Sequence, residues 1–98
     1  MDVVPIVKGI TFTWDRRKAL ANRRKHGVSF ETACEVFFDP FLRVVAEQEA
    51  AGEEREAVIG MTTEWQLLFV VFALRGETVR IISARKTTRS ERKIYETL

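Results

Sequence analysis

The hydrophobic and polar positions of this chain predict a short strand, two helices, four strands and a final helix. Apolar residues alternate with threonines from Ile10 to Trp14, which is the two-residue period of a half-buried strand. Asp15 is a preferred N-cap for a helix over 16–26, and Gly27 is a residue type that commonly ends a helix. A strand followed directly by a short basic helix is therefore expected.

A second helix is predicted to begin at Ser29, another preferred N-cap. Four apolar residues then follow at i, i+3, i+4 and i+7 and share one helical face: Phe30, Ala33, Cys34 and Phe37. Asp39 and Pro40 end this helix, because proline lacks an N–H and disfavours helical geometry in the residue before it. On this apolar face, Cys34 is expected to be an inert core residue.

An antiparallel meander is predicted next, with strands near residues 42–47, 55–61, 65–74 and 77–85. The run from Leu67 to Phe72 is apolar on both faces, which is typical of a covered central strand. Gly76 lies in a turn short enough for a hairpin. Strict alternation in the last strand places Val79, Ile81 and Ser83 on one face and Arg80, Ile82 and Ala84 on the other.

The chain is predicted to end in a third helix, because Thr88 and Glu91 have the spacing of a capping box. Ile94 and Leu98 lie four residues apart and are expected to dock this helix. The order βααββββα predicts a single α+β domain over residues 1–98, with a mainly antiparallel sheet and helices packed on it. Residues 1–10 are expected to form an extended N-terminal arm.

Length and composition exclude several classes of protein. A chain of 98 residues, 46% hydrophobic and 31% charged, has room for one small core and the balance of a globular domain. The longest apolar run, Leu67–Leu74, is too short to span a bilayer. The start has no secretory signal pattern, and the single Cys34 allows no internal disulfide. We therefore expect a cytoplasmic protein without membrane contact.

The net charge of +2 conceals three segments of opposite sign. Residues 1–46 hold eight basic and five acidic side chains, residues 47–64 hold one and six, and residues 65–98 hold seven and three. The closing basic set comprises Arg75, Arg80, Arg85, Lys86, Arg89, Arg92 and Lys93. Guanidinium groups match phosphate geometry, so this set forms either a phosphate-binding surface or an ordinary solvated basic face.

Two further side chains could move protons. Tyr95 lies one helical turn from Arg92, a cation that could lower its pKa, although a core or rim position is the commoner role for this residue type. His26 has an unperturbed pKa close to neutrality, but its place before Gly27 also suits a cation at a helix C-terminus. One His and one Cys cannot complete a structural zinc site, so no metal and no cofactor are expected.

Two blocks of sequence resemble the BrnT family of type II toxins. The first comprises Phe12–Asp15, Lys18, Ala21–Glu31 and Phe38–Pro40; the second comprises Glu54–Arg55, Ile59–Gly60, Arg80–Lys86, Thr88, Glu91–Arg92 and Tyr95. The resemblance runs in order from Phe12 to Glu96 and leaves only about the first ten residues outside it. This sequence departs from the family pattern at two places. Members of the family often have an Asp/His/Ser-rich stretch where this chain has Gln48–Gly52, and they commonly have a basic residue where it has Gln66.

The resemblance implies a RelE-like fold and a ribonuclease toxin that cleaves RNA without metal, by attack of a ribose 2′-OH on the adjacent phosphate. It implies neutralisation by a BrnA-like ribbon-helix-helix antitoxin, which alone contacts operator DNA, in a heterotetramer. Carried onto this sequence, it makes Arg80, Arg85 and Tyr95 the expected catalytic residues. The expected RNA phosphate contacts are Arg75, Lys86, Arg89 and Arg92, with His26 as a further acid–base candidate. The alternative is a non-catalytic binding module that forms a complex with a DNA-binding antitoxin for autoregulation.

Overall fold

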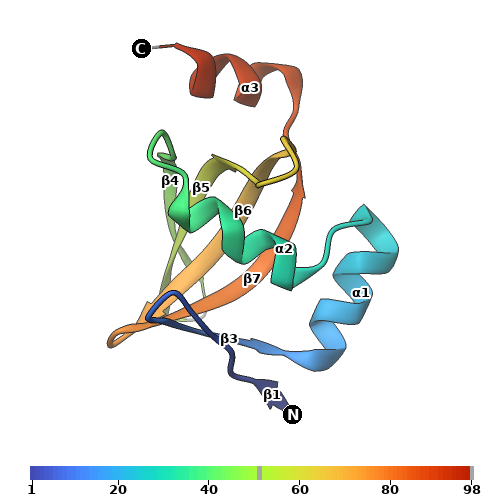
Figure 1. The fold of residues 1–98 in the computed structure, drawn as a ribbon. Helices are drawn as coiled ribbons and strands as arrows, with labels where there is room; N and C mark the ends of the chain where they lie inside the picture. Colours follow the sequence, from blue (N-terminus) through green and yellow to red (C-terminus); the bar gives the residue numbers. More distant parts are fainter. Residues whose placement is uncertain (51, 98) are drawn as a thin grey trace.

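The computed structural model describes residues 1–50 and 52–97, with side chains described at all of these except 46–50. A mixed sheet of seven strands forms the framework, and Figure 1 shows a helix running across one of its faces. A second helix lies beside that face and the last helix lies over one end of the strands (Figure 1). The predicted α+β class is confirmed.

The strands are β1 (Asp2–Val3), β2 (Ile6–Val7), β3 (Ile10–Asp15), β4 (Arg43–Ala50), β5 (Glu53–Met61), β6 (Leu67–Arg75) and β7 (Thr78–Lys86). The helices are α1 (Arg16–His26), α2 (Phe30–Cys34), the 3-10 helix η1 (Glu35–Phe38) and α3 (Arg89–Glu96). The sheet order is β1-β3-β7-β6-β5-β4, with β2 also paired to β3. Only β3 and β7 pair in parallel among these strands. Beyond the predicted order, the N-terminal arm adds β1 and β2, which fold back on β3.

The predicted helix ends are confirmed at three caps. The Asp15 carboxylate accepts the Lys18 N–H at 3.1 Å, and the Ser29 hydroxyl accepts the Thr32 N–H at the same distance. Gly27 follows α1 with φ 72°, a left-handed conformation that glycine adopts without a steric penalty. The second helix is shorter than predicted, because the chain tightens into η1 from Glu35 onward.

The core lies between the sheet and the helices α1, α2 and η1. Phe12, Trp14 and Phe30 are buried, and Trp14 meets Phe30 edge to face with centroids 5.9 Å apart. Gly60 lets η1 approach β5 closely, because a Cβ there would lie 2.7 Å from the Cβ of Val36. Burial, together with nearby Glu31, raises the pKa of Cys34 to about 12, so its thiol is protonated and inert as predicted.

The predicted alternation along β7 is wrong because the strand contains a bulge. Val71 pairs with Ser83 and Phe72 with Ile81, which leaves Ile82 as an extra residue without a partner. Beyond the bulge the facing is reversed, so Ala84 joins the buried core face with Val79 and Ile81. The same reversal places Arg80 and Arg85 on one face, opposite α1 and α2, although strict alternation separates them.

The predicted docking of α3 through Ile94 is also wrong. Ile94 is 48% exposed, and Leu98 lies outside the described residues. The helix begins at the predicted capping box of Thr88 and Glu91, but no α3 residue is buried in the described chain. Polar contacts with β7 and with Asp39 hold α3 instead.

Asn22 attaches α1 to the free edge of β7. Its amide nitrogen donates to the Val28 carbonyl at 3.1 Å and to the Ala84 carbonyl at 2.8 Å, and its amide oxygen accepts the Ala84 N–H at 3.1 Å. The β3–β7 pairing extends only to Arg80, so this side chain replaces a neighbouring strand at Ala84. A buried amide that satisfies three backbone groups is a strong constraint on both elements.

We expect Asn22→Ala to lower the free energy of unfolding by about 2–4 kcal/mol, because it leaves buried backbone groups of β7 and of the α1–α2 connection unpaired. Arg23→Ala is the matched control: it changes an exposed residue of the same helix and should alter stability by less than about 0.5 kcal/mol. Urea unfolding followed by circular dichroism measures both. Equal losses in the two variants would contradict the role assigned to the Asn22 amide.

Candidate phosphate-binding site

The helix α3 lies across one end of the sheet, and polar contacts bind both ends of the helix to strands. Near its start, the Glu91 carboxylate pairs with Arg85 of β7, and beyond its end the Thr97 carbonyl accepts a hydrogen bond from Arg43 of β4. Between these points α3 contacts β5. The helix therefore crosses the sheet from β7 to β4.

Arg85 is held rigidly by two neighbours. Its Nη1 and Nη2 atoms donate to Oε1 and Oε2 of Glu91 at 2.8 and 2.9 Å, and its guanidinium lies 4.3 Å from the centroid of the Phe69 ring. The hydrogen bond with Glu91 raises the pKa of Arg85, and the same contact lowers the pKa of Glu91. The side chain remains 34% exposed, so this fixed cation can still be approached from solvent.

The carboxylate of Asp39, which follows η1, binds groups from β5 and α3 at the same end of the sheet. Its Oδ2 accepts the Tyr95 hydroxyl at 2.6 Å and the Met61 N–H at 2.7 Å, and its Oδ1 accepts the Phe41 N–H at 2.9 Å. Desolvation raises the pKa of Asp39, but these three hydrogen bonds, led by that of Tyr95, outweigh it and hold the pKa below its ordinary value. The carboxylate thus links η1, β5 and α3.

The pKa of Tyr95 is raised to about 12, not lowered as its proximity to Arg92 suggested. Burial is the largest cause, followed by the hydrogen bond to the Asp39 carboxylate and by the charge of that carboxylate. The phenol is therefore protonated at neutral pH. In this state Tyr95 can donate a proton or a hydrogen bond but is a poor base.

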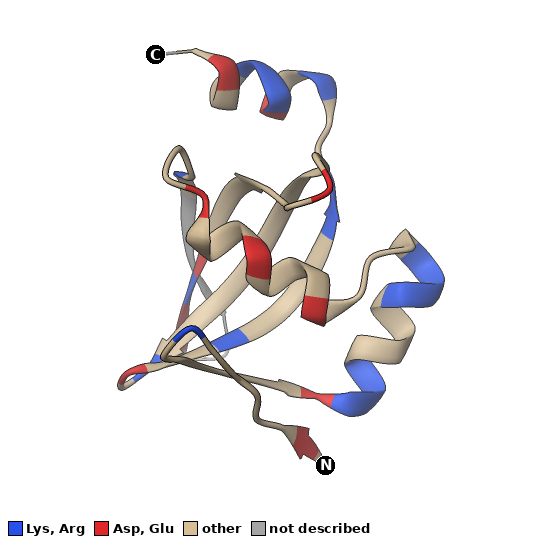
Figure 2. Ribbon diagram, viewed as in Figure 1, with Lys and Arg blue, Asp and Glu red and all other residues tan. Residues whose placement is uncertain are grey.

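Three exposed cations follow Arg85 at the end of β7 and on α3: Lys86, Arg89 and Arg92. Within the described chain no carboxylate approaches them to within 4 Å. Lys86 and Arg92 line a recess of about 260 Å³ together with Gln66 and Thr87. Figure 2 shows positive charge on α3 and at the end of β7, with a second basic group on α1.

The other predicted site residues lie elsewhere. Arg80 shares the face of Arg85 but lies roughly 15 Å away along β7, where it pairs with Asp2 at 3.2 Å. Arg75 lies further along the same face, at the end of β6, and pairs with Glu53 at 2.9 Å. His26 occupies the last turn of α1, and no hydrogen bond joins it to Arg80, Arg85 or Tyr95 in the described residues. The predicted set is thus divided into separate groups.

Sequence reasoning missed two residues of this corner. Asp39 was assigned only to ending a helix, and its bond to Tyr95 joins residues 56 positions apart. Trp65 was assigned to a strand, but it lies in the β5–β6 loop, where it borders both the basic recess and an apolar cavity of about 550 Å³. Neither had a local signal, because the role of Asp39 depends on a partner far along the chain and the exposure of Trp65 depends on the loop that only the structure defines.

The departures from the family pattern fall into different parts of the molecule. Gln66 is exposed at the basic recess, beside Lys86 and Arg92. The side chains of the stretch Gln48–Gly52 lie largely outside the described residues.

The described residues contain no group of three or more His, Cys, Asp or Glu side chains arranged to hold a metal ion. None of the described helices is both long and apolar enough to cross a membrane. Arg85 beside Phe69 and the three exposed cations are the groups here that could bind an anion such as phosphate.

This fold and this site define a small α+β protein that gathers positive charge around its last helix. Residues 14–91 match the sequence profile of the family described as the ribonuclease toxin, BrnT, of type II toxin–antitoxin systems. The chain belongs to this family, as its sequence motifs indicated.

A solved structure supports the same relationship. The chain is similar to the crystal structure of the Brucella abortus ribonuclease toxin BrnT, with a TM-score of 0.62 and 27% sequence identity. The match covers 78% of this chain and 94% of the Brucella chain. Comparison with curated proteins finds no match.

We expect acid to weaken the attachment of α3. The pKa values of Asp39 and Glu91 are lower in the folded chain than in the unfolded chain, so their contribution to stability is present above about pH 4.5. It is lost as the pH falls through the lowered folded values. The wild type should lose unfolding free energy between pH 5 and pH 2. In Asp39→Asn and in Glu91→Gln this loss should be smaller than in the wild type by about 1 kcal/mol each.

Glu77→Gln, at an exposed turn carboxylate, provides the control and should leave the pH dependence almost unchanged. Urea unfolding midpoints of the wild type and the three variants, measured across this pH range, test the prediction. If the wild type and both corner variants lost stability in parallel, the two carboxylates would not be the groups responsible.

Proposed function

We propose that this chain is a metal-independent endoribonuclease toxin that inhibits translation by cleaving RNA, and that its active centre lies at the corner formed by β7 and α3. The observation that carries the proposal is the anchored Arg85 beside the exposed cations Lys86, Arg89 and Arg92, in a chain that belongs to a ribonuclease toxin family. Both features favour a substrate with a phosphate backbone.

The reaction that fits this corner is attack of a ribose 2′-oxygen on the adjacent phosphorus, with loss of the 5′-oxygen. The 2′-hydroxyl gives up its proton to solvent water, and the departing 5′-oxygen gains one from a donor of the protein. Negative charge increases on the phosphoryl oxygens in the transition state, and a rigid guanidinium stabilises it because little reorganisation is needed. Arg85 is suited to this role, since Glu91 and Phe69 fix its position.

Tyr95 is suited to supply the proton to the 5′-oxygen, because a raised pKa keeps its phenol protonated. Its one O–H donates to Asp39 at 2.6 Å, so for the transfer this hydrogen turns from Asp39 to the departing 5′-oxygen. His26 is the second candidate for proton transfer, from α1. Arg80 and Arg75 extend the proposed RNA path along the same face of the sheet, where each would exchange its carboxylate partner for a phosphate.

The same proposal includes a protein partner. Membership in a type II toxin–antitoxin family supports an antitoxin that neutralises this chain. We propose a BrnA-like ribbon-helix-helix protein that alone binds operator DNA, in a heterotetramer located in the cytoplasm. The RelE-like character of the fold belongs to the proposal as well.

A non-catalytic binding module is the second candidate, and one observation favours it. Arg75, Arg80 and Arg85 already pair with carboxylates inside the chain, so an acidic partner segment could replace those carboxylates as readily as RNA could. In that case the basic corner would serve complex formation and autoregulation only.

The deciding experiment measures cleavage of a labelled single-stranded RNA by the purified chain in excess EDTA. We expect products ending in a 2′,3′-cyclic phosphate and a 5′-hydroxyl. Arg85→Ala should reduce the rate about 100-fold or more, because it removes a transition-state cation. Tyr95→Phe should reduce it substantially by removing the donor, and His26→Gln tests the second candidate for proton transfer.

Two controls separate chemistry from structure. Glu91→Gln weakens the same ion pair but keeps the cation, the Phe69 contact and one hydrogen-bond acceptor, so it should lose far less activity than Arg85→Ala. Arg24→Ala removes an exposed cation of α1, away from the corner, and should retain activity too. Equal losses in Arg85→Ala and Glu91→Gln would mean that Arg85 only anchors α3, and absence of cleavage by the wild type would favour the binding module.

A further inference from the structure

The loop between β5 and β6 carries an exposed tryptophan in a backbone conformation that favours glycine. The Trp65 N–H donates to the Thr62 carbonyl at 3.1 Å, and the Thr62 N–H donates to the Gln66 carbonyl at 2.8 Å, which closes a three-residue hairpin loop. The last residue of such a loop is usually a left-handed glycine. Trp65 occupies that position with φ 63° and is 83% exposed, whereas Trp14 is 2% exposed.

The loop holds this indole on a rigid support. The buried Thr62 accepts the Gln66 N–H on its hydroxyl at 3.0 Å. Thr63 donates its N–H and its hydroxyl to Oε1 of Glu35 at 2.9 and 2.8 Å. A bulky residue held with positive φ and little burial gains almost nothing for the core, and such local violations concentrate at functional sites.

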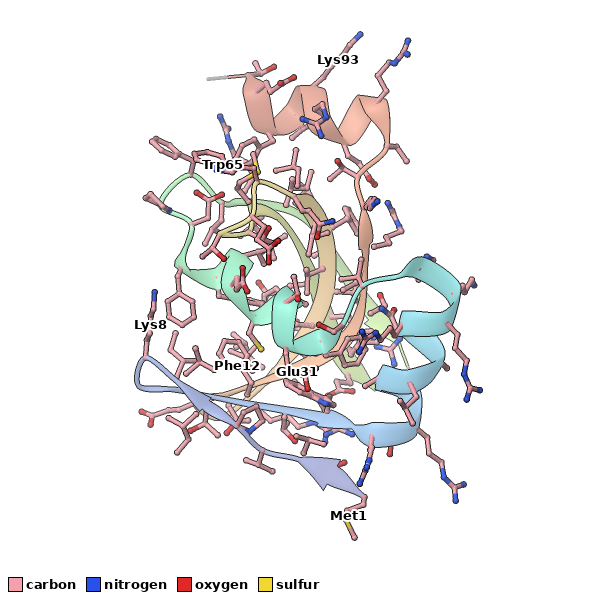
Figure 3. The ribbon with its side chains drawn as sticks, turned by 45° about the vertical axis from the view of Figure 1, so that its right-hand side comes forward. Met1, Lys8, Phe12, Glu31, Trp65 and Lys93 are labelled. Carbon is pink, nitrogen blue, oxygen red and sulfur yellow. The ribbon has the colours of Figure 1, made fainter. Side chains whose placement is uncertain are left out.

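The surroundings of Trp65 indicate which ligand it suits. The recess of about 260 Å³ beside the indole is lined by Gln66, Leu67, Lys86, Thr87 and Arg92, and none of these carries a carboxylate. Figure 3 shows Trp65 in the loop below α3, whereas Lys93 points from α3 away from the sheet. An exposed aromatic face next to two cations and an amide is the combination with which proteins bind unpaired nucleobases.

We propose that Trp65 is a stacking platform for one unpaired base of the RNA, with the neighbouring phosphates on Lys86 and Arg92 and the edge of the base within reach of the Gln66 amide. This inference rests on the proposed function for the identity of the ligand. The site adjoins the proposed catalytic corner at the start of α3, where Arg92 lines the recess and the preceding Glu91 binds Arg85. Single-stranded RNA is therefore bound there and duplex RNA is not, because paired bases are not free to stack.

Binding of 2′-O-methyl oligouridine, which cannot be cleaved by 2′-OH attack, tests this inference separately from catalysis. Because Trp14 is buried, we expect the oligomer to quench the fluorescence of Trp65, and an abasic oligomer of the same length to bind without this quenching. Trp65→Gly should weaken binding of the oligouridine about 5- to 100-fold. It should leave binding of the abasic oligomer unchanged and should not lower the Tm, since glycine accepts this φ.

Two further variants complete the design. Trp65→Phe keeps an aromatic face and should bind within a few-fold of the wild type, and Phe41→Ser changes an exposed aromatic on the neighbouring apolar cavity without weakening RNA binding.

Lack of quenching by oligouridine, or an equal loss of both oligomers in Trp65→Gly, would overturn the proposal. So would unchanged RNA binding combined with weaker antitoxin binding in both Trp65→Gly and Phe41→Ser, which would identify a protein-docking surface. Base-dependent quenching by a chain that cleaves no RNA would support the platform while refuting the ribonuclease.

Discussion

The carboxylate of Asp39 joins three segments at the end of the sheet that carries the candidate site. It accepts hydrogen bonds from the N–H groups of Phe41 and Met61 and from the Tyr95 hydroxyl. The first two fix the chain after η1 against the end of β5, and the third brings α3 to the same point. Because α3 has no buried residue in the described chain, these polar contacts, with those of Arg85 and Arg43, replace the apolar docking that usually holds a terminal helix. The position of every cation on α3 depends on them.

The edge of β7 imposes a second constraint, and it decides which cations share a surface. The bulge at Ile82 reverses the facing of the strand, so that Arg85 lies on the same face as Arg80. Asn22 then satisfies the backbone of Ala84 from α1, beyond the point where β3 pairing ends. The bulge interrupts the regular pairing of β7 with β6, whereas the buried amide serves the opposite edge of β7, where it supplies hydrogen bonds that β3 no longer makes.

The candidate site could be predicted in its residue types but only partly in its geometry. Arg85 and Tyr95 were identified from the sequence, and the structure places both around α3. Arg80 and Arg75 were grouped with Arg85 and Tyr95 because the order of charges along a sequence does not give their separation in space. In the structure, the extended strands place Arg80 and Arg75 roughly 15 Å or more from Arg85. The direction of the Tyr95 pKa shift was wrong for the same reason. The nearby cation Arg92 was visible in the sequence, but the burial and the Asp39 carboxylate that raise the pKa come from tertiary packing.

The sequence by itself determined the local elements, since caps, periods of two or 3.6 residues and turn residues act over only a few positions. Asp15, Gly27, Ser29 and the Thr88–Glu91 box predicted helix ends that the structure confirms. It also determined the family, through motifs spread along most of the chain. Only the tertiary structure decided the bulge in β7, the bond between Asp39 and Tyr95 and the exposure of Trp65. Each of these depends on which distant segments of the chain meet. The free energy of those contacts outweighs the regular alternation of a strand, the ordinary pKa of a tyrosine and the usual residue type at a loop position.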